Sequence, residues 1–194
     1  MTAAFPIRPP GAVFSEFCSE ALAYESEIRR VLGDRWDPLF QAIRLRGGTL
    51  TFSDDQSEAA FHFNSATGNF TFFNRGFVAL RDAMLVVVGP SPELDAGYLF
   101  EISDAAYGLH ELYHTAQGLS QFSIVQDHKR VPAGMDEIAK LDHQADNMGA
   151  SLVAAVLSAR AGTLSRLDYL RRLRDVLIIL NMAAPIAFGV PDLK

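Results

Sequence analysis

Two histidines four residues apart, with a glutamate beside the first, are the residues of this sequence best suited to chemistry. They lie in the segment HELYH, residues 110–114. Residues four apart stand one turn above each other on a helix face, so His110 and His114 can reach one metal ion. Glu111 lies beside them without ligating, where it can take a proton from a metal-bound water whose pKa the metal lowers. The segment indicates a metal-dependent hydrolytic site.

A catalytic zinc site usually has three protein ligands and a fourth position for water, so one further ligand is expected downstream. The segment DHQAD, residues 142–146, supplies candidates on the next long helix. Asp142 and His143 are the alternatives there, with side chains roughly 100° apart around the helix. An acid elsewhere, Asp136 or Glu137, is a further alternative.

The motif H-E-x-x-H followed by a helix bearing D-x-x-A-D resembles the gluzincin-type zinc metallopeptidases, in which the second segment reads E-x-x-A-D. The resemblance implies Zn²⁺ ligands at His110, His114 and Asp142. It also implies that Glu111 is the general base and that Asp146 supports His110 without touching the metal. Aspartate at 142 departs from the family pattern, whose glutamate is one methylene longer, so the two helices would have to approach more closely.

The resemblance covers roughly residues 100–155 and implies a zincin-like fold. In such peptidases an antiparallel sheet lies over the motif helix, and its edge strand pairs with an extended peptide substrate. The segments NFTFF (69–73) and MLVVV (84–88) are the two candidates for that edge. Gly149 would let the second helix pack closely on the motif helix.

The expected function is zinc-dependent hydrolysis of peptide bonds in a peptide or protein substrate. The alternative is a metal-binding but non-proteolytic pseudo-peptidase or regulatory peptide-binding module, because a small chain leaves few residues for substrate subsites. A di-iron helical protein would need a second E-x-x-H segment, which the sequence lacks. Candidates for stabilising the oxyanion are one loop histidine and three tyrosines, with no choice among them: His128, Tyr107, Tyr113 and Tyr169.

Apolar residues at helical spacing predict two N-terminal helices, one from about residue 12 to Gly33 and one over 38–45. Three strands follow, TLTFS, AAFHFN and NFTFF, and the loop SATG makes an antiparallel hairpin of the last two. His62 is an ordinary residue of the strand face away from the phenylalanines. The β-branched run at 84–88 favours a fourth strand over a helix.

The C-terminal half reads as helical. A helix over 98–118 is followed by a loop containing Pro132 and Gly134, and then by a long helix over 136–160. A last helix is capped by Ser165 or Thr163. Its buried stripe is expected to consist of leucines at helical spacing: Leu167, Leu170, Leu173, Leu177 and Leu180.

Together these elements predict an α+β fold, with a small antiparallel sheet packed on the motif helix, N-terminal helices and two long C-terminal helices. An extended lead-in over 1–11 precedes a single zincin-like domain over 12–194. The α/β half of this domain covers about 12–90, and the helical half about 93–190.

Composition narrows the function classes. The chain has 194 residues, 49% of them apolar, which is enough to bury a core and argues against disorder. Seventeen Lys and Arg against 23 Asp and Glu, without a basic run, argue against nucleic acid. One cysteine, Cys18, excludes a cysteine-rich metal site, so histidines and carboxylates must hold any metal. With no recognisable signal peptide and an apolar segment at 176–190 too short to span a membrane, the expected location is the cytoplasm.

Overall fold

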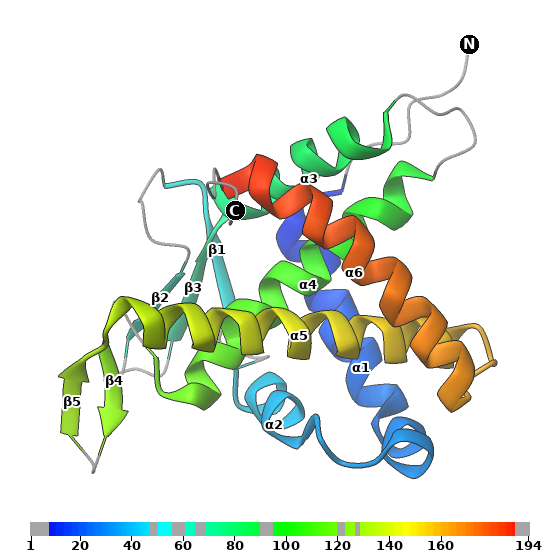
Figure 1. Ribbon diagram of the computed structural model, residues 1–194, viewed down its shortest axis with the longest axis horizontal. Coiled ribbons are helices and arrows are strands. Elements are labelled where there is room, and N and C mark those ends of the chain that lie inside the picture. Colours follow the sequence, from blue (N-terminus) through cyan, green and yellow to red (C-terminus); the bar gives the residue numbers. More distant parts are fainter. Residues whose placement is uncertain are drawn as a thin grey trace.

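The computed structural model describes residues 8–46, 50–55, 61–64, 69–89, 95–119, 123–126 and 129–188, and it is mostly helical (Figure 1). The helices in these ranges are α1 (Pro10–Leu32), α2 (Asp37–Arg46), α3 (Asn74–Val88), α4 (Ala96–Gln117), α5 (Met135–Arg160) and α6 (Arg166–Phe188). The strands are β1 (Leu50–Ser53), β2 (Phe61–Asn64), β3 (Asn69–Phe73), β4 (Ser123–Gln126) and β5 (Lys129–Pro132).

The two N-terminal helices form where the sequence predicts them. Helix α1 buries Phe14, Phe17 and Ala21 at helical spacing and ends at Gly33, whose φ of 90° suits a residue without a side chain. It begins at Pro10, so the end of the expected lead-in is already helical, because proline is tolerated in a first turn. Cys18 is buried in α1, and burial raises the pKa of its thiol far above the ordinary value.

The sheet is mixed rather than antiparallel. Its strand order is β1-β3-β2, with β1 parallel and β2 antiparallel to β3. The antiparallel pairing of AAFHFN with NFTFF is therefore confirmed over the described residues, and the SATG loop lies outside them. Residues 69–73 form the central strand, so this segment is not the edge to which a peptide could be added.

The segment 84–88 is helical, and the expected fourth strand was wrong. In α3 the buried side chains Phe77, Leu80, Arg81 and Met84 recur at intervals of three and four residues. This periodicity decides the outcome, since the helix propensity of a valine is only a few tenths of a kcal/mol below average. Leu85 and Val86 are left exposed on the outer face of α3. Neither of the two segments proposed as the substrate edge is thus an edge strand.

The sheet reaches the motif helix through α1. Phe72 of β3 packs against Phe14 of α1 and Phe77 of α3, with ring centroids 5.3 and 5.6 Å apart. Phe14 in turn lies so close to α4 that a Cβ on Gly108 would be 2.5 Å from its ring. The expected direct packing of the sheet on the motif helix is therefore replaced, in these contacts, by packing through α1 and α3.

The C-terminal half contains the three expected helices and one element that was not expected. Strands β4 and β5 pair antiparallel where a loop was predicted around Pro132. Helix α6 begins after Ser165, whose Oγ accepts a hydrogen bond from the backbone of Asp168, so Ser165 is the cap. No helix among the described residues is long and apolar enough to cross a membrane.

The buried stripe of α6 is rotated relative to the expected one. The side chains that are fully buried are Tyr169, Val176 and Ala183, whereas Leu167 and Leu170 are 58% and 51% exposed. A helix that is apolar on several faces does not show by sequence alone which face meets the core. Contact with α3 and α5 selects the face, and these helices lie beside α6 in Figure 1.

A buried ion pair joins α3 to α4. The guanidinium of Arg81 donates two hydrogen bonds to Asp104, of 2.9 and 2.5 Å, and a third to the backbone carbonyl of Arg8. Arg81 and Asp104 are only 6% and 0% exposed. Burial raises the pKa of Asp104 to about 6, although Arg81 opposes the shift. The pair fixes α3 against the helix that bears the HELYH segment.

We expect Arg81→Met to lower the free energy of unfolding at pH 7 by about 3 kcal/mol, because Asp104 is left charged and buried without a partner. The deficit relative to the wild type should shrink as the pH falls from 7 to 5, where the raised pKa lets Asp104 take up a proton in the folded state. Urea unfolding at several pH values measures both effects.

The matched control is Arg174→Met, which removes an exposed arginine paired with Asp175. Its effect should stay below about 1 kcal/mol at every pH, as is usual for exposed ion pairs. Equal effects of the two substitutions would contradict a structural role of the buried pair.

Candidate metal centre

Helix α4 holds the two histidines of the HELYH segment on one face. Its first turn is capped by Asp95, whose Oδ1 accepts hydrogen bonds from the backbone of Gly97 and Tyr98 at 2.9 and 3.4 Å. The helix continues without interruption to Gln117, so His110 and His114 lie one turn apart. Their ring centroids are 4.5 Å apart, and their Nε2 atoms face each other at 2.9 Å.

The Nδ1 atom of each imidazole bonds to an oxygen. Nδ1 of His110 lies 2.8 Å from Oδ1 of Asp146, and Nδ1 of His114 lies 2.7 Å from Oε1 of Gln117. The amide orientation of Gln117 follows from its other end, where Nε2 donates to the backbone carbonyl of Leu141 at 3.0 Å. Both Nδ1 atoms therefore carry the proton, since carboxylate and amide oxygens only accept.

The neutral imidazoles consequently turn two lone pairs on Nε2 toward each other. At 2.9 Å this contact is repulsive unless a cation, either a proton or a metal ion, lies between the nitrogens. Hydrogen bonding of the outer nitrogen to a carboxylate or a carbonyl is also the usual arrangement of histidine ligands, because it fixes the tautomer and the ring orientation. The arrangement of His110 and His114 thus fits metal ligation through Nε2.

A carboxylate from α5 lies beside His114. Oδ1 of Asp142 lies 3.2 Å from Nε2 of His114. Ligand atoms around a tetrahedral zinc ion are about 3.3 Å apart, given bond lengths near 2.0 Å. The two measured separations, 2.9 and 3.2 Å, differ from that value by a few tenths of an ångström. Nε2 of His114 therefore lies at separations typical of zinc ligands from both Nε2 of His110 and Oδ1 of Asp142.

Glu111 belongs to the same cluster. Among the described residues, potential ligand atoms of His110, Glu111 and His114 lie within 4.8 Å of one another, and Asp142 adjoins the group at His114. Glu111 is only 6% exposed, and the hydroxyl of Tyr107, one turn earlier on α4, lies near enough to lower the pKa of its carboxyl group.

The position of Tyr107 depends on a glycine in α3. A Cβ on Gly76 would lie 2.0 Å from the Tyr107 hydroxyl, so only glycine leaves room for that side chain in its present place. The first turn of α3 therefore lies directly against the Tyr107 phenol.

The electrostatic environment differs among the acidic and basic groups of the cluster. Burial raises the pKa of Glu111, only partly offset by the two histidines and Tyr107. Burial would lower the pKa of His110, but the hydrogen bond to Asp146 and the surrounding carboxylates outweigh it, so this pKa is raised. The imidazole of His114 beside it lowers the pKa of Asp142 despite its partial burial.

The alternative ligands point elsewhere. His143 is exposed, and its ring bonds to Asn147 of the same helix at 3.0 Å. Asp136 and Glu137 are exposed in the first turn of α5. Of the other oxyanion candidates, Tyr169 packs on Trp36, and His128 lies outside the described residues.

Helix α5 approaches the motif helix closely at Gly149. A Cβ there would lie 3.0 Å from the carbonyl oxygen of Ala106 and 3.3 Å from the backbone nitrogen of His110. The prediction that this glycine permits close packing is confirmed. Asp142 and Asp146 lie on the two preceding turns of the same helix, so this contact also sets how near they come to the histidines.

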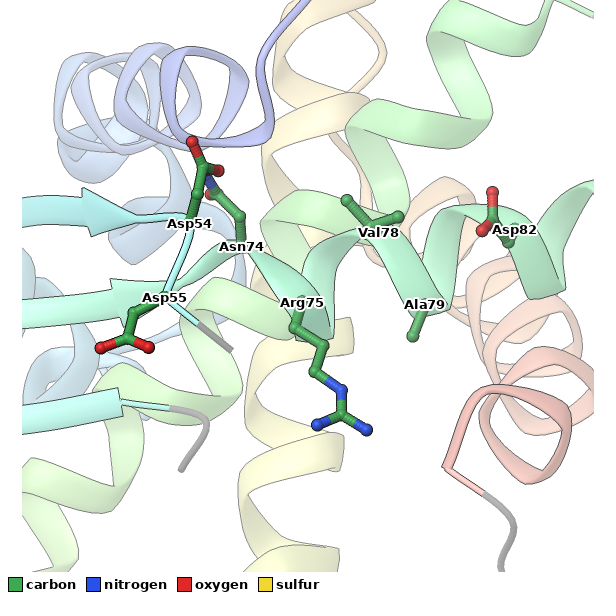
Figure 2. A pocket seen from close by; sticks show the side chains of 7 residues that line it. All are labelled: Asp54, Asp55, Asn74, Arg75, Val78, Ala79 and Asp82. Atoms are coloured by element: carbon green, nitrogen blue, oxygen red, sulfur yellow. The ribbon is translucent and has the colours of Figure 1, made fainter. Parts of the chain in front are cut away.

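A cleft of about 430 Å³ lies elsewhere, along the outer face of α3. Figure 2 shows its lining, in which Arg75 and Asp82 project to opposite sides of that helix. Asp54 lies beside Asn74 and accepts a hydrogen bond from its amide at 2.7 Å. None of the residues of the metal cluster lines this cleft.

For two residues near the cluster, Gln117 and Tyr107, the sequence analysis did not predict the contact that the structure shows. Both stand at helical spacing from the motif, Gln117 three residues after His114 and Tyr107 four residues before Glu111. A polar side chain three or four positions away on the same helix face can reach a motif residue. That spacing was the available signal.

Comparison of the chain with protein-family models, with curated proteins and with solved structures gives no match. The function must therefore be argued from the cluster itself.

We expect Gly149→Ala to weaken zinc binding about tenfold, because the added methyl group pushes α5, and with it Asp142 and Asp146, away from the histidines. Global stability should change little, since alanine is the better helix former by about 1 kcal/mol and offsets part of the crowding. Competition with a chelator measures the affinity, and urea unfolding measures the stability.

The control is Gly134→Ala, whose added methyl group meets no atom within 4 Å. Zinc affinity should be unchanged in this variant. Unaltered affinity in Gly149→Ala would mean that the close approach of the helices does not determine the geometry of the site.

Proposed function

We propose that the protein is a zinc-dependent hydrolase of peptide bonds. The observation that carries the proposal is the pair of imidazoles whose Nδ1 atoms are both bonded to oxygen acceptors while their Nε2 atoms converge beside a carboxylate. Two histidines and one carboxylate form a donor set that suits zinc and leaves a position open. The residues that would hold the ion are His110, His114 and Asp142.

Zinc, when bound, supplies Lewis-acid activation of a water molecule at neutral pH. Glu111 is the general base in this proposal, since its carboxylate lies within 4.8 Å of the histidine nitrogens. It takes the proton of the attacking water and passes it to the amine that leaves.

The choice of a peptide bond as substrate is supported by the resemblance of the two segments to gluzincin-type peptidases. One observation favours a second candidate, a metal-binding module without hydrolytic activity. Glu111 is nearly buried, and the described cleft lies away from the cluster, on the outer face of α3. Both the hydrolase and the non-hydrolytic module would bind a metal, so only a measurement of peptide cleavage distinguishes them.

Metal analysis tests the ligand set. We expect one equivalent of zinc in the wild-type protein and at least a hundredfold loss of affinity in His110→Ala, because a ligand is removed. Asp146→Ala should bind zinc about 10- to 100-fold more weakly, as is usual when a residue that orients a metal ligand is removed. His143→Ala serves as the control and should bind zinc normally, since its ring bonds away from the cluster.

Retention of stoichiometric zinc by Asp142→Ala with unchanged affinity would reject Asp142 as the third ligand. Loss of zinc in His143→Ala but not in Asp142→Ala would assign the ligand to His143.

A Glu111→Gln variant tests the chemistry. We expect it to bind zinc with near wild-type affinity while cleavage of a peptide library, followed by mass spectrometry, falls by about 10²- to 10⁴-fold, the usual contribution of a general base. Turnover retained in this variant would contradict the mechanism. Zinc binding by a wild-type protein that cleaves no peptide would favour the non-hydrolytic module.

A further inference from the structure

Gln117 occupies an unusual position between the two helices of the metal cluster. It is the last residue of α4, and the chain turns away immediately afterwards at Gly118, which adopts the left-handed conformation with φ of 72°. From there its side chain reaches both His114 on its own helix and the backbone of α5. Sequence reasoning assigned no role to this residue.

The two ends of the Gln117 amide make different contacts. Its Oε1 accepts from Nδ1 of His114 at 2.7 Å, and its Nε2 donates to the carbonyl of Leu141 at 3.0 Å. Because an amide group is planar and rigid, these two bonds fix the distance between His114 and the backbone of α5. Leu141 directly precedes Asp142, so this distance also determines where the carboxylate lies.

Gly149 restrains the same helix one turn beyond Asp146. Between the bond at Leu141 and the close contact at Gly149, α5 is held near α4 over the two turns that carry both aspartates. An aspartate is one methylene shorter than a glutamate, and in this arrangement its Oδ1 comes within 3.2 Å of Nε2 of His114. The short side chain of Asp142 is therefore long enough to reach His114 because α4 and α5 lie close together.

We propose that Gln117 is a positioning residue that fixes the tautomer of His114 and holds α5 at the distance at which an aspartate, rather than a glutamate, completes the metal site. The inference rests on the metal site of the proposed function. It is independent of whether the bound metal hydrolyses peptides.

Three variants of the 194-residue chain test this role. Gln117→Met keeps the length and helix propensity but removes both hydrogen bonds, and Asp142→Glu lengthens the ligand. The double variant Gln117→Met/Asp142→Glu combines them. Gln41→Met, on an exposed position of α2, is the matched control.

The readouts are zinc affinity, measured against a chelator, and the visible absorption spectrum of the Co²⁺-substituted protein, which reports the coordination geometry. We expect Gln117→Met to bind zinc about 10- to 100-fold more weakly and to shift the Co²⁺ spectrum. Asp142→Glu alone should also bind more weakly, because the longer side chain is crowded. In the double variant, most of the loss of zinc affinity caused by Asp142→Glu should disappear, since α5 is then free to move away from α4.

A Gln117→Glu variant separates the two roles and guards against failure of the methionine variant to fold. It keeps an acceptor for His114 but loses the donor to Leu141. We therefore expect a smaller loss of zinc affinity than in Gln117→Met. Combined with Asp142→Glu, it should restore as much of the zinc affinity lost in Asp142→Glu as Gln117→Met does.

The outcomes are distinguishable. A wild-type protein that binds no stoichiometric metal overturns the proposed function together with this inference. Normal metal binding by the wild type, with unchanged affinity and Co²⁺ spectrum in Gln117→Met, overturns the inference alone. The inference is also overturned if Asp142→Glu lowers zinc affinity by the same factor with and without Gln117, because additive effects mean that the two positions are not coupled.

Discussion

The close approach of α5 to α4 is the constraint on which the geometry of the candidate site depends. It is set by Gly149, where no side chain separates the two backbones, and by the amide of Gln117, which joins Leu141 to His114. Without this approach the carboxylates of α5 would not reach the imidazoles of α4. The rest of the helical half follows, since α5 also packs on α1 and α6 and so fixes the motif helix within the core (Figure 1).

The cluster illustrates how hydrogen bonds prepare a cation site. Each imidazole donates a hydrogen bond from Nδ1 to an oxygen and keeps a lone pair on Nε2. The two lone pairs point toward each other. Such an arrangement is unfavourable for neutral rings by themselves and favourable once a cation lies between them. In the proposed function, binding of the ion would recover this stability, as is common at functional sites.

The sequence predicted the elements that carry strong local signals. Gly33 ends α1, helical periodicity locates α4 and α5, and the spacing of the HELYH segment brings His110 and His114 together. The pairing of Asp146 with His110 matched what the resemblance implied. These features depend on residues near one another in the chain or on a motif with fixed geometry.

The remaining features depend on tertiary contacts that a single sequence does not contain. The valine-rich segment 84–88 became helical because Phe77, Leu80 and Met84 meet the core at helical spacing. The parallel pairing of β1 with β3 joins segments about twenty residues apart without any local turn signal. The bond from Gln117 to Leu141 of α5 depends on the distance between two helices, which no spacing within one helix can reveal.

Crystals of the wild-type protein grown with zinc, with diffraction data collected at the zinc absorption edge, test the central claim most directly. We expect a single anomalous peak bonded at about 2.0 Å to Nε2 of His110, Nε2 of His114 and Oδ1 of Asp142, with Glu111 unligated. An ion bound at other residues, or no peak at this cluster at saturating zinc, would contradict the claim that α4 and α5 together form a metal centre.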